Sequence, residues 1–286
     1  MNISDKLVEH QRLRSFIKCA GGKTQLLPQI LPLLPEEFGN YHEPFVGGGA
    51  LYWALANSGK LEGKIARLSD LNQRLITTYQ QVQENPKAIL SILRGLKNDA
   101  LLYYQIRTMF NAGQLSDATS AAYYIYLNKT CYNGMYRVNQ NDHFNVPFGK
   151  YSNPNFCDEQ NIISCSRVLN SVKTEIECCP FQNVVNYARA GDFVFFDSPY
   201  LPINETSNFT FYTKEGFSYA DQIYLHNVAL DLYYGKVKVM LCNSDHPKIR
   251  ELYKQHFKIY TVKCKRSVNS NAGKRGEVDE LVITNY

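Results

Sequence analysis

The apolar residues of this chain follow two spacings, and the change from one to the other predicts its elements. Short apolar or aromatic runs are typical of buried strands, and they occupy residues 40–46, 64–70, 191–200, 236–244, 257–265 and 278–286. Leucine, isoleucine and tyrosine instead recur every three or four residues from about 76 to 130, which predicts a block of helices. Leucines at helical spacing also occupy residues 24–34, where prolines interrupt them.

Strands alternate with helices near both ends of the chain, which predicts a parallel α/β sheet with a helical insertion. We expect a discontinuous domain of residues 1–75 and 155–286 and an inserted domain of residues 76–154. Residues 131–154 are rich in Asn, Gly, Pro and aromatics and predict a loop or hairpin. The last two strands are expected to form an antiparallel hairpin at the sheet edge. Two independent domains in series are the alternative, but neither end has enough strands alone.

Composition is that of an ordinary globular protein, with 44% hydrophobic and 20% charged residues in 286. No apolar run is long enough to span a bilayer, and the first residues lack the core of a signal peptide, so we expect a cytoplasmic protein. The eight cysteines form no C-x-x-C pair and lack histidines at zinc-ligand spacing. They are interpreted as mostly buried thiols in a reducing compartment, and no metal is expected.

One strand ends in an unusual way, because "FVFF" runs directly into Asp197, Ser198, Pro199 and Tyr200. A strand followed by a proline turn is the plain interpretation. A carboxylate, a stiff backbone and an aromatic ring at a strand end also suit the binding and activation of a flat base.

Two glycine motifs resemble nucleotide-binding loops but lack essential residues. "AGGKT" would need a glycine at Ile17 to be a phosphate-binding loop, and "GGGALY" has Tyr52 where a dinucleotide fingerprint has its third glycine. The segment from Glu43 through Phe45 to Gly47 and Gly49 still predicts a strand end, a glycine loop and a helix start, where a ligand can approach the backbone.

Asp70 ends the next expected strand, where a carboxylate can accept bonds from ribose hydroxyls. The alternative role of Asp70 is to cap the helix that follows. Together these features predict a nucleoside pocket without pyrophosphate-binding parts, and S-adenosyl-L-methionine fits it. The Asp197 carboxylate and the Ser198 carbonyl could then accept both N6–H bonds of an adenine, which would aim the nitrogen lone pair at the methyl group. Tyr200 could stack on the base.

The motifs "KCAGGK", "EPFVGGGAL", "LSDLNQ" and "FFDSPY" occur in this order, followed by the ending "ELVITNY". In this respect the chain resembles the Dam-type DNA adenine-N6 methyltransferases of the alpha (D12) class, particularly members of DpnII-type restriction systems. "CYNGMYRVN" and "FNVPFGKY" resemble that family's target-recognition hairpin. The resemblance implies a Rossmann-like S-adenosylmethionine-dependent methyltransferase sheet that carries an inserted target-recognition domain and hairpin.

The resemblance also implies site residues. Cofactor contacts carry over to Cys19, Lys23, Asp70 and Asp197, and DNA contacts to Lys18, Tyr132, Asn133, Met135, Arg137, Pro147 and Lys150. Two positions depart from the family pattern. Cys19 stands where a large side chain is usual, which reduces stacking on the cofactor, and Ser198 replaces the first proline of D-P-P-Y.

An enzyme that modifies a paired base must flip it out and fill the gap, and Tyr132, Asn133 and Met135 could supply the wedge. Arg137 has the donors for a guanine edge, whereas the remaining cations suit phosphates. Those cations are Lys150, Lys265, Arg266, Lys274 and Arg275. An ordinary hairpin loop and a solvated charged face are the alternatives.

We therefore expect a monomeric enzyme that uses S-adenosyl-L-methionine to methylate adenine N6 in double-stranded DNA, without a metal or a membrane. The resemblance favours GATC as the target and allows a cognate restriction endonuclease as a partner. A DNA-binding module with impaired catalysis and an adenine-N6 methyltransferase acting on RNA are the alternatives.

Overall fold

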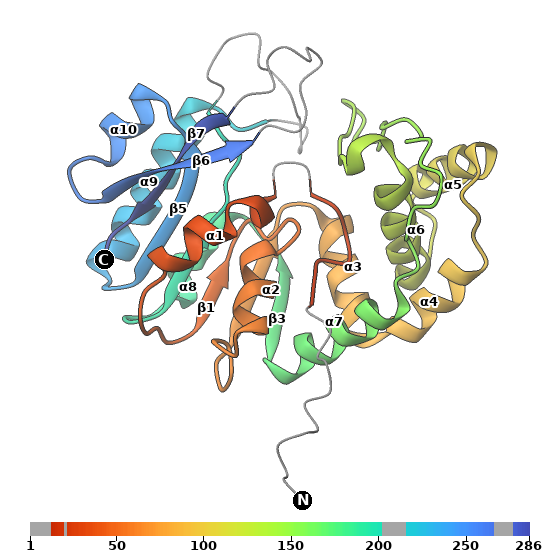
Figure 1. The fold of residues 1–286 in the computed structure, drawn as a ribbon, viewed down its shortest axis with the longest axis horizontal. Coiled ribbons are helices and arrows are strands. Elements are labelled where there is room, and N and C mark those ends of the chain that lie inside the picture. Colours follow the sequence, from red (N-terminus) through yellow and green to blue (C-terminus); the bar gives the residue numbers. More distant parts are fainter. Residues whose placement is uncertain (1–12, 20–21, 202–215, 266–276) are drawn as a thin grey trace, which may run out of the picture.

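The computed structural model describes residues 13–19, 22–201, 216–265 and 277–286, and a seven-stranded sheet forms its centre (Figure 1). Its strands are β1 Tyr41–Glu43, β2 Ala66–Asp70, β3 Thr174–Cys178, β4 Phe193–Phe196, β5 Lys238–Ser244, β6 Lys258–Lys265 and β7 Glu277–Thr284. They lie in the order β3-β2-β1-β4-β5-β7-β6, with β1 to β5 parallel and β7 antiparallel to both β5 and β6. The expected α/β sheet and its terminal hairpin are thus confirmed.

The central strand β4 shows why this sheet needs helices on both faces. All four of its residues are buried, and their side chains alternate between two apolar clusters. Phe193 and Phe195 belong to the cluster that includes α1 Leu27–Ile30, α2 Ala50–Asn57 and α3 Gln73–Glu84. Val194 and Phe196 belong to the cluster with α8 Val184–Tyr187, α9 Tyr219–Tyr234 and α10 Pro247–Tyr253. When helices cover both faces of a sheet, its edges and strand ends remain accessible to ligands.

A block of helices lies beside the sheet, on the right in Figure 1. It consists of α4 Pro86–Arg94, α5 Ala100–Ala112 and α6 Asp117–Thr130, and α7 Glu159–Ser171 returns the chain to the sheet. The predicted helical stretch is confirmed, with breaks where the sequence signals them. Pro86 begins α4, Gly113 ends α5 in the left-handed conformation, and the Ser116 side chain caps α6. No helix within the described residues has both the length and the apolarity to cross a bilayer.

Helix α3 joins this block to the sheet. It packs against α6, and its Gln80 and Gln83 side chains donate to backbone carbonyls at Ile176 and Thr174 in β3. The helix begins before residue 76, so the predicted limits of the insertion cut through an element that serves both parts. Those limits stay a prediction.

The region 131–154 is an irregular hairpin, as predicted. Residues Tyr132–Gly134 form a 3-10 turn, and two antiparallel bridges, Cys131 with Phe148 and Val138 with Phe144, hold the two sides together. Gly149 is required where the sides cross, because a Cβ atom there would lie 2.5 Å from the Cys131 carbonyl oxygen.

The edge strand β3 was not predicted. Its residues alternate between partly buried and exposed positions, with Glu175 and Glu177 on the exposed side, and Ile176 is its one aliphatic residue. An edge strand that packs on one face lacks the apolar run that marks the buried strands.

Candidate active site and DNA interface

The tetrapeptide from Asp197 to Tyr200 follows β4 at the carboxyl end of the parallel strands. The Lys23 ammonium lies 2.5 Å from a carboxylate oxygen of Asp197 and 4.7 Å from the centre of the Tyr200 ring. Lys23 is 4% exposed and the Asp197 side chain 22%. Burial lowers the pKa of Lys23, but the Asp197 carboxylate raises it further, so the net pKa lies above its ordinary value. Burial also raises the pKa of Asp197, and the Lys23 ammonium opposes that rise.

Two buried amides hold the turn that contains these residues. The Gln222 side chain in α9 donates to the Pro199 carbonyl at 2.8 Å, and it accepts a 2.8 Å bond from the Asn243 amide. Asn243 and Ser244 in β5 bond the N–H and the carbonyl of Leu201. Gln222 and Asn243 are fully buried, so this part of the turn is rigidly positioned and the Pro199 carbonyl is engaged inside the protein.

Ser198, the departure from D-P-P-Y, is 2% exposed, and its hydroxyl has no hydrogen-bond partner among the described residues. A buried hydroxyl without a partner costs about 1–3 kcal/mol. The serine is therefore accommodated by the turn without contributing to its stability.

The glycine loop between β1 and α2 has the backbone that only glycine adopts easily. Gly47 and Gly49 have φ angles of +44° and +63°, and Gly49 is the N-cap of α2. A Cβ atom on Gly49 would also lie 2.9 Å from the Tyr79 hydroxyl, whose proton is donated to the Gly47 carbonyl. The predicted strand end, glycine loop and helix start are thus confirmed, and the close approach of Tyr79 is a second reason for glycine at position 49.

Asp70 connects this loop to the end of β2. Its carboxylate accepts the Gly47 N–H at 3.2 Å and the Asn72 N–H at 3.0 Å. The N-cap of α3 is Asn72, whose side chain accepts from Leu75 N–H, so the alternative interpretation of Asp70 as the helix cap is wrong. Asp70 is 4% exposed and fixes the two strand ends relative to one another.

Cys19 lies among the other residues predicted to bind the cofactor. Its sulfur lies 3.4 Å from the position of a Cβ atom on Gly47. Desolvation by the surrounding protein and the Asp197 carboxylate raise the pKa of the Cys19 thiol to about 11, while Lys23 lowers it and Asp70 raises it. The structure thus brings Cys19, Lys23, Asp70 and Asp197 within electrostatic reach of each other, although Cys19 retains an exposed surface.

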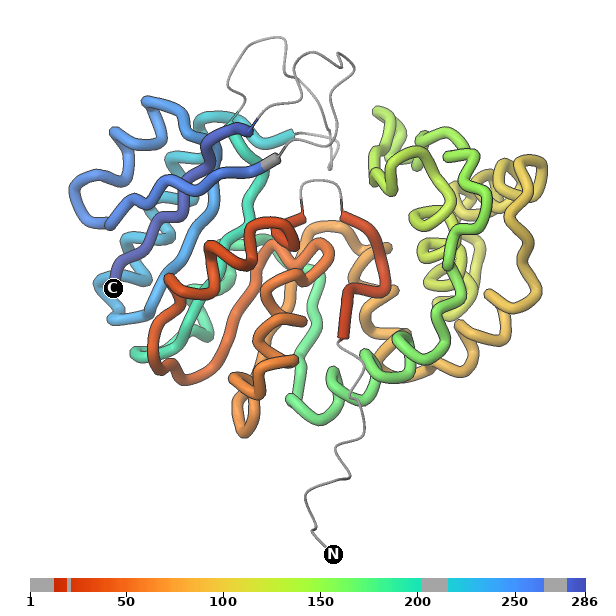
Figure 2. The backbone as a smooth tube through the Cα atoms, viewed as in Figure 1, coloured from red at the N-terminus to blue at the C-terminus, as the bar shows by residue number. Residues whose placement is uncertain are grey.

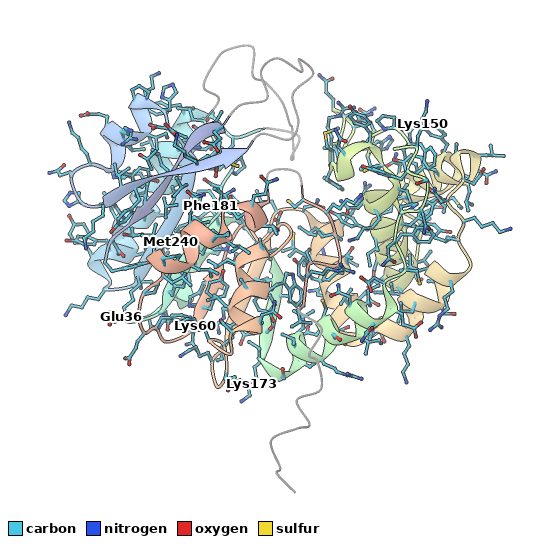
Figure 3. All side chains as sticks on the ribbon, viewed as in Figure 1. Glu36, Lys60, Lys150, Lys173, Phe181 and Met240 are labelled. Carbon is cyan, nitrogen blue, oxygen red and sulfur yellow. The ribbon has the colours of Figure 1, made fainter. Side chains whose placement is uncertain are left out.

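Phe45 takes part in an aromatic cluster that the sequence did not predict. Its ring stacks on Phe181 at 5.2 Å with an interplanar angle of 25°, and it meets the edge of Phe217. Phe181 follows β3 and is labelled in Figure 3. Phe181 is 8% exposed, so this stack is internal packing, and Phe45 is the half-buried member that lies next to the glycine loop.

The predicted DNA contacts form a second group, which gathers around the hairpin. Tyr132 is 51% exposed, and Asn133, Arg137, Pro147 and Lys150 are also exposed, whereas Met135 is half-buried. Figure 3 places Lys150 at the end of the molecule opposite Lys60 and Lys173, which lie just before β2 and β3 begin. The hairpin therefore stands at the end toward which the carboxyl ends of the parallel strands point.

Lys18 joins the hairpin from the N-terminal segment. A Cβ atom on Gly134 would collide with the aliphatic part of Lys18, and the Lys18 ammonium lies 4.1 Å from the Tyr151 ring centre. Figure 2 shows the segment before residue 20, in red, passing between the sheet and the helical block. Residues 18 and 19 thus bring the two groups of predicted site residues into contact.

The remaining predicted cations are placed less completely. The Arg137 guanidinium donates through Nε to the Asn145 side chain at 2.8 Å, which leaves its terminal nitrogens outward. Lys265 ends β6, but its side chain lies outside the described residues, as do Arg266, Lys274 and Arg275 altogether. Among the described residues, no group of three or more His, Cys, Asp or Glu side chains could hold a metal ion.

Sequence reasoning missed three residues that shape the turn from Asp197 to Tyr200, namely Gln222, Asn243 and Glu280, and it missed Phe181 beside Phe45. Glu280 in β7 accepts a 2.7 Å hydrogen bond from the Tyr200 hydroxyl, across 80 positions of sequence. Polar residues inside apolar strands and helices, such as Asn243 in "VMLCNS", were the signal that could have found them.

Comparison with known proteins agrees with this geometry. The family model described as "D12 class N6 adenine-specific DNA methyltransferase" matches residues 20–268. The chain is 40% identical to "Type II methyltransferase M1.LlaDCHI" of Lactococcus lactis subsp. cremoris over 96% of each chain. It is also 40% identical to "Type II methyltransferase M.MjaIII" of Methanocaldococcus jannaschii, over 96% of this chain and 99% of that protein. A "DNA adenine methylase" of Salmonella typhi is 35% identical over 94% of each chain.

Proposed function

Because the chain belongs to the D12 class of N6 adenine-specific DNA methyltransferases, we propose that it transfers the methyl group of S-adenosyl-L-methionine to the adenine of GATC in duplex DNA. The observation that carries this proposal is the contact of Lys23 with Asp197 and Tyr200 at the end of β4. Lys23 thereby connects two groups to the residues around the glycine loop. They are the Asp197 carboxylate, proposed to bind N6, and the Tyr200 ring, proposed to stack on the base.

The residues present fit the cofactor. The loop from Gly47 to Gly49 offers backbone beside a helix start, and Asp70 presents a carboxylate at the neighbouring strand end. Phe45, which is half-buried and held by Phe181, would offer an apolar side chain to an adenine ring. When bound, S-adenosyl-L-methionine supplies an electrophilic methyl group. Asp70, Phe45 and the glycine loop would hold its nucleoside part.

The protein's task in the reaction is to orient the target amine and to receive its proton. Asp197 and the Ser198 carbonyl would accept the two N6–H bonds, since the Pro199 carbonyl is already bonded to Gln222. These bonds localise the nitrogen lone pair and aim it along the line of transfer. Asp197 would receive the proton that N6 loses when the methyl group leaves the cofactor's sulfur and bonds to N6. Until then the neighbouring Lys23 would favour the ionised form of Asp197, and Tyr200 would stack on the base.

The hairpin would recognise the target sequence, and its side chains would fill the gap that the flipped adenine leaves in the duplex. Tyr132, Asn133 and Met135 are assigned to the gap that a flipped adenine leaves, and Arg137 to a guanine edge. Lys18, Pro147 and Lys150 would contact the DNA beside them. The names of two relatives as Type II methyltransferases support a role beside a cognate restriction endonuclease. We further propose that the enzyme acts as a monomer in the cytoplasm, because one copy can modify both strands of a palindrome in two visits.

Transfer of labelled methyl from S-adenosyl-L-methionine to duplex oligonucleotides tests this function. We expect incorporation into a duplex with one GATC, little into the same duplex with GTAC, and N6-methyladenosine after digestion to nucleosides. Asp197→Ala should nearly abolish turnover, and Ser198→Pro should keep it within about tenfold, which is about 1.4 kcal/mol in the barrier. Label on cytosine would refute the assigned chemistry, and label at another motif would refute GATC alone.

A further inference from the structure

We propose that Glu280 is a positioning residue, whose carboxylate holds the Tyr200 ring in the plane needed to stack on the target adenine. The inference rests on the proposed stacking role of Tyr200. It assigns a function to the C-terminal strand pair of β6 and β7, from which Glu280 contacts the turn from Asp197 to Tyr200.

The contact itself is short and comes from a distant part of the chain. The Tyr200 hydroxyl donates to Glu280 Oε2 at 2.7 Å. Glu280 lies in β7, paired with Ser244 of β5 and with Val262 of β6. Its backbone is therefore fixed by hydrogen-bonded strands on both sides, and a half-buried carboxylate on such a support is a rigid acceptor.

The other contacts of Tyr200 leave the far end of its side chain free to move. The Lys23 ammonium lies over the ring face, and the backbone just before Tyr200 is fixed by the bond from Gln222 to the Pro199 carbonyl. Neither contact fixes the far end of the ring against swinging about the Cα–Cβ bond. The hydrogen bond from the hydroxyl does, and because a phenolic O–H prefers to lie in the plane of its ring, the position of the Glu280 acceptor also favours one ring plane. Burial raises the pKa of Tyr200 well above its usual value, so the phenol keeps the proton that it donates.

The neighbouring residue in the same strand provides a matched control. Asp279 lies next to Glu280 in the same strand, and it is exposed and 3.9 Å from the Lys263 ammonium. Successive side chains in a strand point to opposite faces, so Glu280 faces the catalytic turn and Asp279 faces away from it. Asp279 is therefore a control with the same charge on the same strand.

Kinetics of Glu280→Ala, Glu280→Gln, Tyr200→Phe and the double variant Glu280→Ala with Tyr200→Phe test the inference, with Asp279→Ala as the control. We expect Glu280→Ala and Tyr200→Phe to lower kcat by a similar factor, on the order of tenfold to a hundredfold, with KM for cofactor and DNA within about twofold. The double variant should be no slower than either single one. Glu280→Gln, which keeps an acceptor, should restore kcat to within about threefold of the wild type.

Each outcome has one meaning. The inference would be overturned if the factors by which the two single variants lower kcat multiply in the double variant. It would also be overturned if KM rises while kcat stays unchanged, because Glu280 would then act apart from Tyr200. Thermal unfolding and cofactor binding of each variant separate misfolding from positioning, and Asp279→Ala should match the wild type. A wild-type enzyme that is inactive with S-adenosyl-L-methionine would refute the proposed function itself. If the wild type is active and the kcat of Glu280→Ala equals that of the wild type, this inference alone is refuted.

Discussion

The Asn128 side chain makes two hydrogen bonds with the backbone of Lys18. Its Oδ1 accepts the Lys18 N–H at 2.6 Å, and its Nδ2 donates to the Lys18 carbonyl at 2.9 Å. The same Nδ2 lies 3.3 Å from the Gly134 carbonyl, inside the turn predicted to wedge into DNA. One buried amide of α6 therefore ties the segment that leads to Cys19 to the segment expected to enter the duplex.

Asn128→Ala should weaken duplex binding because the wedge turn loses its anchor to Lys18. The loss of bonds at a residue 3% exposed should also lower the free energy of unfolding by about 1–3 kcal/mol. Asn57→Ala is the matched control. Asn57 makes the same pair of bonds with the Leu13 backbone, at 2.9 Å each, on the same segment but away from the turn. We expect it to change stability slightly and DNA affinity not at all, as measured by thermal unfolding and by duplex titration. Equal loss of DNA affinity in both variants would contradict the anchoring role.

Asp70 and Asn72 should separate into a ligand residue and a helix cap. Asp70→Asn keeps an acceptor oxygen but loses the charge, so we expect weaker S-adenosyl-L-methionine binding with duplex affinity nearly unchanged. Asn72→Ala removes the cap of α3 and should cost about 1 kcal/mol of stability. Calorimetric titration with the cofactor and thermal unfolding distinguish the two effects. The assignment fails if Asp70→Asn binds the cofactor as well as the wild type does.

These residues show how far the sequence predicts the molecule. The buried strands and the glycine loop were predictable because apolar runs and glycines carry their own signals. The acid at the end of β2 was found for the same reason, since Asp70 ends such a run. The choice between Asp70 and Asn72 as the cap could not be made, because both are good capping residues two positions apart.

The supporting residues were beyond prediction for a different reason. Asn128, Gln222 and Glu280 each act on a segment between 23 and 110 positions away. An asparagine in a helix or a glutamate in a strand has no local pattern that names its partner. The role of Glu280 follows from the strand order, in which only β5 separates β7 from β4. Asn128 and Gln222 lie in α6 and α9, and their roles follow from where those helices pack.

Glu43 should make stability depend on pH. Burial raises the pKa of this carboxyl from 4.5 to about 8, the hydrogen bond from Tyr41 opposes the rise, and Asp197 adds to it. The folded protein thus holds the proton more tightly than the unfolded chain does. The stability linked to Glu43 is fully present below the unfolded pKa and is lost as pH rises toward about 8.

Glu43→Gln keeps the acceptor for Tyr41 and cannot ionise. Between about pH 5 and about pH 9, the wild type should lose more unfolding free energy than Glu43→Gln, as measured by denaturant titration. Parallel curves for the two proteins would refute a shifted Glu43.

Gly149→Ala should disable the hairpin for steric reasons alone. The added Cβ would lie 2.5 Å from the Cys131 carbonyl oxygen and 2.6 Å from the Tyr151 ring, so the two sides of the hairpin must separate. We expect DNA binding to fall at least tenfold, which corresponds to about 1.4 kcal/mol, while cofactor binding persists. Gly95→Ala is the control, since its nearest contact would be an ordinary 3.4 Å. Unchanged DNA binding in Gly149→Ala would show that the hairpin does not contribute to the interface.

Arg137 and Lys150 should affect DNA recognition in different ways. Arg137 is held through Nε by Asn145, and its two terminal nitrogens, which have no partner within the described part of the chain, could form a bidentate pair with a guanine edge. Arg137→Ala should therefore relax the preference for one guanine of GATC and cost about 1–3 kcal/mol of discrimination. Asn145→Ala should relax the same position by less, because the arginine remains but loses its orientation.

Lys150 is exposed, and its ammonium is a point charge that suits a phosphate contact. Lys150→Ala should weaken binding to all duplexes alike and reduce the slope of affinity against salt by about one phosphate contact. Methylation rates on GATC and on its single-base variants, measured at several salt concentrations, separate these effects. If Arg137→Ala slows every duplex equally, Arg137 contacts the backbone, and the guanine must be recognised by another residue of the hairpin.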